Sequence, residues 1–173
     1  MNVSFFWRRA SAEAVSSLAP HDLLELVPYW GEQQESWDTG LVTGVEFHCS
    51  VMHQVLIECS PTHADAAGLA VYGGEPRSDL WTNPDGEAEE VTVVTVLAPD
   101  EVASAAEALS GSQHAAWITA NPQRMTAMVQ ELRFSTSWDD GWARRVAGDL
   151  QGLAHFYRTA ASAGDAMIKY ISC

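Results

Sequence analysis

Apolar residues recur every three or four positions in several segments of the chain, which is the pattern of an amphipathic helix. The longest of these segments spans 140–163, and Gly164 is its natural C-terminal stop. In another, Cys49, His53 and Leu56 fall on one side. Shorter helices are predicted at 11–19, as a turn within 21–30, and at 45–59, 99–110, 113–120 and 122–133.

Two segments have the character of strands. β-branched residues dominate "VTVVTVLAP", which starts at Val91, and Pro99 prevents its continuation. The segment "DAMIKYIS" is apolar on both alternating sides, as in an inner strand. A short extended run is also expected at 69–72, before Gly73. The pattern predicts one α+β domain over 1–173, with several helices around a small sheet that pairs the strand near Val94 with the final one.

Two segments are polar, rich in turn residues and poor in apolar ones, and both are predicted to be loops. The first, 31–44, contains Trp37 and several acidic residues. The second, 73–90, contains Trp81 and a larger number of acidic residues. A connection as long as the second is usually a lid, a binding loop or disordered. Tryptophans in loops can anchor a partner or line a pocket, although they often fold back onto the core.

The composition is that of a globular domain, because 47% of the 173 residues are hydrophobic and 18% are charged. No apolar run reaches the roughly 20 residues that cross a bilayer, and Arg8 and Arg9 follow the first apolar residues rather than precede them. We therefore expect a cytoplasmic protein without a secretory signal. The net charge of −14 disfavours nucleic acid and membrane surfaces. It would suit a basic protein partner, and it also serves solubility alone.

The stretch "HCSVMHQVLIECSPTH" at 48–63 raises the question of a metal site, since Cys49, His53, Cys59 and His63 have the spacing Cys-x3-His-x5-Cys-x3-His. Cys49 and His53 lie on one side of a helix. Cys59 is rotated by roughly 80° from that side at about 100° per residue. We therefore predict no metal site, with Cys49 as a small buried hydrophobe. Metal binding through Cys49 and His53 is the alternative.

Four segments together resemble a known family: the helix around His53, "YGGEP" at 72–76, "VLAPDEVASAAEAL" at 96–109 and "LAHFYRTAASAGDAMIKYI" at 153–171. They are similar to the YfbM-like family of small bacterial proteins, which is domain of unknown function 1877 and has an α+β fold. The family pattern has a tryptophan four residues before the histidine that matches His53, and this chain has Cys49 there. The resemblance implies no catalytic residue, cofactor or substrate.

Two main hypotheses for function follow from the residues. The first is a non-enzymatic module that binds another protein, for example a basic one, through its acidic loops and the loop residues Trp37 and Trp81. The second is a small-ligand-binding protein or enzyme with a cleft under the 73–90 loop, where His53 and Tyr157 would be the polar groups. Neither hypothesis specifies an oligomeric state.

Overall fold

The computed structural model describes residues 3–82, 85–110 and 113–172, and its centre is a five-stranded antiparallel sheet. The strand order is β2-β1-β5-β4-β3. The strands are β1 (Ser4–Ala10), β2 (Val42–Glu46), β3 (Glu75–Thr82), β4 (Ala88–Leu97) and β5 (Ala166–Ser172). Val96 pairs with Ile168, so the predicted pairing of the Val94 segment with the final strand is confirmed.

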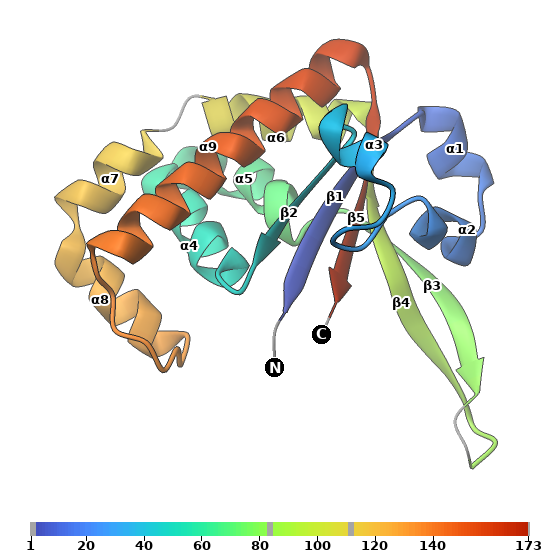
Figure 1. Ribbon diagram of the computed structural model, residues 1–173, viewed down its shortest axis with the longest axis horizontal. Helices are drawn as coiled ribbons and strands as arrows, with labels where there is room; N and C mark the ends of the chain where they lie inside the picture. Colours follow the sequence, from blue (N-terminus) through green and yellow to red (C-terminus); the bar gives the residue numbers. More distant parts are fainter. Residues whose placement is uncertain (1–2, 83–84, 111–112, 173) are drawn as a thin grey trace.

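Helices cover both faces of this sheet (Figure 1). They are α1 (Ala12–Ser17), α2 (Pro20–Glu25), α3 (Gln34–Asp38), α4 (Cys49–Cys59), α5 (Ala64–Val71), α6 (Pro99–Ser110), α7 (His114–Ala120), α8 (Pro122–Glu131) and α9 (Asp140–Ala163), with a short 3-10 turn at Pro61–His63. Helices α4 to α9 pack on one face and α1 to α3 on the other. The α+β prediction is confirmed, including the long helix followed by the last strand.

The two faces have separate apolar cores because neighbouring side chains of β1 point in opposite directions. Trp7 is fully buried on the face that carries α4 to α9, and Phe6 is buried on the other. The prediction from sequence contains no strand at 4–10, although β1 is paired on both sides. Its apolar residues are contiguous rather than alternating, since both faces of the strand are covered.

Helix α9 has the predicted bounds, and its two ends show why. The Asp139 side chain accepts a hydrogen bond of 2.8 Å from the Trp142 N–H, which caps the first turn. At the other end Gly164 has φ 71°, a left-handed conformation that glycine adopts without a steric penalty. None of the described helices is both long and apolar enough to cross a membrane.

Three predicted boundaries in the first half of the chain are wrong. The segment 69–72 is not extended, because Leu69 and Ala70 continue α5, which buries its small residues against the core. The segment 31–44 is not one loop, since α3 and the start of β2 lie within it. The predicted helix at 45–59 begins only at Cys49, because the chain first completes β2 and then turns through Phe47, whose φ is 66°.

The predicted loop at 73–90 is also wrong, because most of it is a β-hairpin formed by β3 and β4. Strand β3 lies at the edge of the sheet, and its side chains are mostly exposed. An exposed edge strand needs no apolar alternation, so its polar sequence gave no strand signal. Residues 83 and 84 of this segment lie outside the described ranges.

Candidate functional site

The β3-β4 hairpin extends away from the body of the molecule (Figure 1) and carries exposed apolar side chains. Leu80 is 73% exposed and Trp81 is 53% exposed. Leu80 lies opposite Glu90 and Trp81 lies opposite Glu89 in the cross-strand register. These two large apolar side chains point to opposite faces of the hairpin, and each stands next to a carboxylate on its own face. Both remain exposed in the folded chain.

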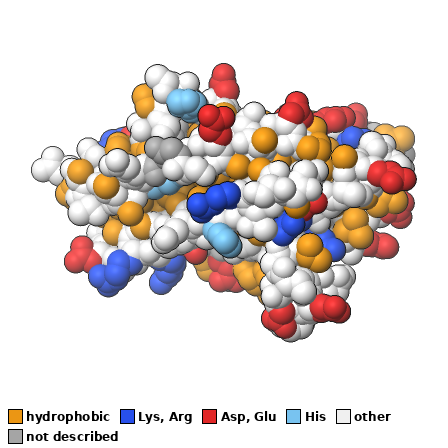
Figure 2. All heavy atoms as spheres, turned by 90° about the horizontal axis from the view of Figure 1, so that it is seen from above, with side chains coloured by type: hydrophobic (Ala, Val, Ile, Leu, Met, Phe, Trp, Pro, Cys, Tyr) orange, Lys and Arg blue, Asp and Glu red, His pale blue; other side chains and the backbone are white. Residues whose placement is uncertain are grey.

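The hairpin is also acidic. Between residues 75 and 97 the only basic residue is Arg77, whose Nε lies 3.6 Å from the Glu75 carboxylate. Six acidic residues share that segment: Glu75, Asp79, Asp85, Glu87, Glu89 and Glu90. Figure 2 shows acidic side chains spread around most of the outline of one face, with basic side chains in a few places. The hairpin therefore combines apolar side chains with a local excess of negative charge.

Asp79 links the hairpin to α2. Its carboxylate lies 2.6 Å from His21 Nδ1 and accepts a hydrogen bond of 2.8 Å from the Leu80 N–H. The Leu80 N–H, followed by His21, holds the pKa of Asp79 below its usual value. The base of the hairpin is thereby attached to the body, while Leu80 and Trp81 continue beyond this contact.

Trp37 lies in a different part of the molecule. Its ring stacks on Trp30 with centroids 4.9 Å apart, and its Nε1 donates a hydrogen bond of 3.0 Å to the Glu32 carbonyl. Both indoles pack near Phe6 on the face of the sheet that carries α1 to α3. Trp37 therefore belongs to an aromatic cluster beside the sheet, and the structure does not bring it together with Trp81.

Cys49 and His53 occupy the first and second turns of α4. Cys49 is fully buried, and this burial raises the pKa of its thiol. His53 is half-buried against Tyr72 in an edge-to-face contact with centroids 4.8 Å apart, and burial lowers its pKa. Within the described ranges no three His, Cys, Asp or Glu side chains are grouped as metal ligands would be.

Tyr157 is a core residue. It is fully buried, its hydroxyl donates a hydrogen bond of 3.0 Å to the Ala70 carbonyl, and burial raises its pKa. Trp7 Nε1 donates to the same oxygen at 2.9 Å. The predicted cleft under 73–90 with His53 and Tyr157 as its polar groups is not formed by the described residues, because the Tyr157 hydroxyl is used at the end of α5 and the hairpin projects elsewhere.

Lys169 completes this arrangement at the end of α5. Its Nζ donates hydrogen bonds to the carbonyls of Leu69 at 2.7 Å, Val71 at 3.3 Å and Gly73. The carbonyls at a helix C-terminus carry partial negative charge and lack partners within the helix, so an ammonium group suits them. Burial nevertheless lowers the pKa of Lys169 to about 7, and Glu101 opposes this to a smaller extent.

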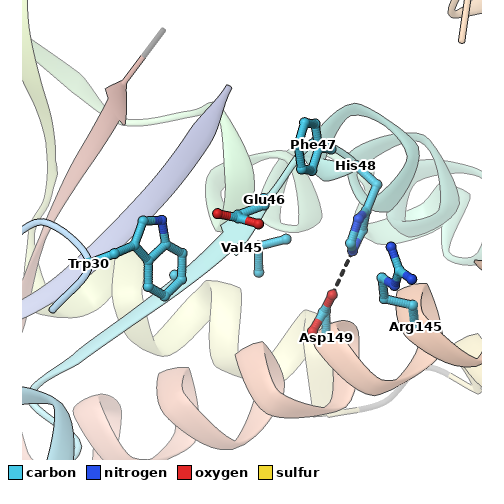
Figure 3. A pocket seen from close by; sticks show the side chains of 8 residues that line it. Trp30, Val45, Glu46, Phe47, His48, Arg145 and Asp149 are labelled. Carbon is cyan, nitrogen blue, oxygen red and sulfur yellow. Dashed lines mark hydrogen bonds and ion pairs between the residues drawn. The ribbon is translucent and has the colours of Figure 1, made fainter. Parts of the chain in front are cut away.

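The described residues also form a pocket of about 480 Å³ between β2, the start of α4 and α9. Figure 3 shows Trp30 on one side of it and His48, Arg145 and Asp149 on the other. His48 Nε2 lies 2.5 Å from the Asp149 carboxylate. Sequence reasoning did not single out this pair, because its members are 101 positions apart and neither belongs to a recognisable motif.

The fold of this chain is similar to that of a known protein. No protein-family model matches the chain, and no curated protein matches it. The solved structures include YfbM from Escherichia coli, described as a protein of unknown function, which superposes with a TM-score of 0.57 over 98% of this chain and 99% of that chain at 15% sequence identity. The chain has a YfbM-like fold. The resemblance seen in the sequence is thus confirmed at the level of the fold.

The YfbM-like fold fixes the arrangement of helices and sheet and leaves the chemistry to individual side chains. Cys49 is fully buried in the core between the sheet and α4 to α9. The hairpin and the pockets are the exposed features of the molecule that offer chemical groups to a partner or ligand.

Proposed function

We propose that this protein is a non-enzymatic protein-binding module that uses the β3-β4 hairpin to bind a basic segment of another protein. The observation that carries the proposal is the pair of exposed side chains Leu80 and Trp81 opposite Glu90 and Glu89. Tryptophan is enriched among the residues that dominate binding energy in protein interfaces. An indole exposed next to carboxylates favours a partner that offers apolar and basic groups together.

The backbone of β3 provides a second mode of contact. Strand β3 lies at the edge of the sheet, so one of its sides is paired with β4 and its other side has no neighbouring strand. The free side of an edge strand can hydrogen-bond to an extended peptide, which adds a strand to the sheet. A basic extended segment would then lie next to the acidic residues of β3 itself, Glu75 and Asp79. The net charge of −14 would steer such a partner toward the molecule.

The test compares the native protein with a Leu80→Ser, Trp81→Ser double variant and with an Ile171→Ser control. Ile171 is 43% exposed in β5, so the control removes a similarly exposed apolar side chain from the same sheet. Each protein is used for affinity capture from cells of the source organism, and the proteins that the native chain retains are purified. Their binding is then measured by calorimetry, and by the backbone amide shifts of 75–82.

We expect a basic partner that shifts the amides of β3. Its affinity should fall by at least about tenfold in the double variant and remain within about twofold in the control, as for loss of a dominant contact. Affinity should also fall with added salt. A partner that binds the double variant as well as the native chain, or that carries a net negative charge, would show that the proposal is wrong.

A further inference from the structure

A larger cavity, of about 790 Å³, adjoins the pocket of Figure 3 and is independent of the hairpin. Phe47, His48 and Arg145 line both. The walls come from the start of β1, the start of α4, the segment that follows α8, the first turns of α9 and the end of α5. We name it the Arg133/Arg145 cavity, after the two arginines that line it.

The charges that line the Arg133/Arg145 cavity are of one sign. Arg133 and Arg145 both line it, whereas no Asp or Glu does. Across the described ranges neither guanidinium lies within 4.0 Å of a carboxylate, while Arg9, Arg77 and Arg124 each do. Two exposed arginines without a carboxylate partner line one cavity of a chain with a net charge of −14 and make it locally positive.

Hydrogen-bonding groups and aromatic rings complete the lining. Hydroxyl groups are supplied by Ser50, Ser135 and Thr136. Aromatic surface is supplied by Tyr72, Phe134 and Trp142, and the last two rings meet edge to face with centroids 5.1 Å apart. The cavity can therefore contact a planar apolar group as well as a charged one.

His48 is held rigidly at the boundary of the cavity. Its Nε2 is bonded to Asp149, as Figure 3 shows, and its side chain is only 7% exposed. The contact with Asp149 fixes the ring orientation. In the part of the chain that the structure describes, no partner is bonded to the other ring nitrogen, Nδ1. The ring is thus positioned in advance of any ligand.

The backbone beside the cavity adopts a left-handed conformation at two positions. Phe47 has φ 66° and Arg133 has φ 60°, and both are bulky residues in the left-handed region that favours glycine. Only one other described residue besides glycine, Gln33, has a positive φ. At Arg133 this conformation ends α8, because the Arg133 N–H donates to the Gln130 carbonyl and the Phe134 N–H donates to the Val129 carbonyl, as at many helix C-termini. The left-handed conformation also sets the direction in which Phe47 and Arg133 leave the chain.

We propose that the Arg133/Arg145 cavity binds a small aromatic anion. Arg133 and Arg145 contact its acidic group, a phosphate or a carboxylate, through charge-assisted hydrogen bonds. Its ring packs against Trp142, Phe134 and Tyr72. The volume of about 790 Å³ lies within the range of small-molecule sites, about 300–1,000 Å³.

The experiment titrates the native protein with phenyl phosphate and with benzoate, which separates the two kinds of acidic group. Inorganic phosphate and phenol serve as comparison ligands that carry the charge or the ring alone. Binding is followed by calorimetry and by the indole N–H signal of Trp142, which a Trp142→Phe variant assigns. Three variants are compared: Arg133→Gln, Arg145→Gln and Arg144→Gln.

Arg144 is the matched control, because it is an exposed neighbour of Arg145 on the same helix that does not line the cavity. We expect one of the two aromatic anions to bind more tightly than phosphate or phenol and to shift the Trp142 signal. Arg133→Gln and Arg145→Gln should each weaken binding by about tenfold, as for loss of one charge-assisted contact. Arg144→Gln should change the affinity by less than about twofold.

Two results would overturn this proposal. One is the absence of binding by either aromatic anion at about 10 mM, the weakest range expected for fragments of this size. The other is equal loss of affinity in Arg144→Gln and Arg145→Gln, which would indicate general attraction to positive charge. The Leu80→Ser, Trp81→Ser variant should bind the anion normally, so failure of the hairpin proposal and failure of this one are distinguishable.

Discussion

The indole of Trp30 lies so close over Gly44 that a Cβ on residue 44 would come within 2.7 Å of its Cη2 atom. The absence of a side chain at this position in β2 lets the indole rest on the sheet. There it stacks on Trp37, with centroids 4.9 Å apart, and contacts Phe6, with centroids 5.2 Å apart. The aromatic cluster thus covers the β2 side of the sheet because one strand residue is glycine.

Gly44→Ala should displace Trp30. The indole is 37% exposed and can move outward, so we expect a moderate loss of stability, about 1 kcal/mol, rather than misfolding. The measurement is chemical denaturation together with quenching of tryptophan fluorescence by iodide, which should increase. A Trp30→Ala, Gly44→Ala double variant should lose only slightly more stability than Trp30→Ala alone, because the new Cβ would still lie 3.2 Å from the Phe5 carbonyl oxygen. An additive loss would contradict the steric explanation.

Gly148→Ala and Gly152→Ala should each stabilise the protein. Both glycines lie inside α9, and a Cβ at either would meet no other atom within 4 Å. Alanine is a better helix former than glycine by up to about 1 kcal/mol, chiefly because it restricts the unfolded chain. Thermal and urea unfolding would measure the gain.

Gly164→Ala is the control for this pair of variants. Its Cβ would also meet nothing within 4 Å, but its φ is 71°. We therefore expect a loss of about 1 kcal/mol, caused by backbone conformation alone. The explanation would be wrong if Gly164→Ala stabilised the protein, or if Gly148→Ala and Gly152→Ala both destabilised it. Either result would show that the backbone angle and the space around the new Cβ do not determine the change in stability.

Lys169 should titrate near neutral pH. Burial lowers its pKa to about 7, and because the chain has one lysine, selective ¹³C labelling gives a single side-chain signal to follow. Between about pH 7 and pH 10 the unfolded lysine holds a proton that the folded one has lost. Unfolding then takes up a proton, so this group makes stability rise with pH, by about 2 kcal/mol from pH 7 to pH 9.

Lys169→Met separates this contribution from those of other groups. The variant leaves the carbonyls of Leu69 and Val71 without their donor, which should cost about 2 kcal/mol at neutral pH. It should also remove the rise in stability above pH 7. A lysine signal that titrates near pH 10 would contradict the prediction, since it would mean that the three carbonyls compensate fully for burial.

His114 should make the protein sensitive to acid. Its side chain is buried, and desolvation lowers its pKa from 6.5 to about 4. Between these values the unfolded chain holds a proton that the folded histidine lacks, so stability falls as pH falls. The contribution is about 2 kcal/mol between pH 7 and pH 5. Urea unfolding should show a shallower dependence on pH in this interval for His114→Leu, and an unchanged dependence would exclude His114 as the cause.

The elements that could be predicted from sequence are those with a complete pattern of their own. Helix α9 has a cap at Asp139, regular apolar spacing and a stop at Gly164, so its bounds follow from local rules. Strand β5 is apolar on both sides because it lies between β1 and β4. Strand β1 also lacks alternation, because helices cover both faces of the sheet, and no flanking signal marks it as a strand.

Long-range contacts explain what the sequence did not reveal about the candidate sites. Trp81 and Trp37 were both predicted as binding residues, because the sequence around each is polar and acidic. In the structure Trp81 is exposed, whereas Trp37 packs within the aromatic cluster. Tyr157 is polar on an apolar helix face, and only the carbonyl of Ala70, 87 positions away, shows that it is structural. Arg133 and Arg145 come together only because the chain turns between α8 and α9.

The burial of Lys169 has a consequence for covalent labelling. It is the one lysine in the chain and is 4% exposed, so every basic side chain on the surface is an arginine or a histidine. Acylating reagents, and enzymes that acetylate lysine or form isopeptide bonds, therefore find no accessible side-chain amine on the folded molecule. Acylation at Lys169 requires β5 to separate from the end of α5, and its rate measures how often that opening occurs.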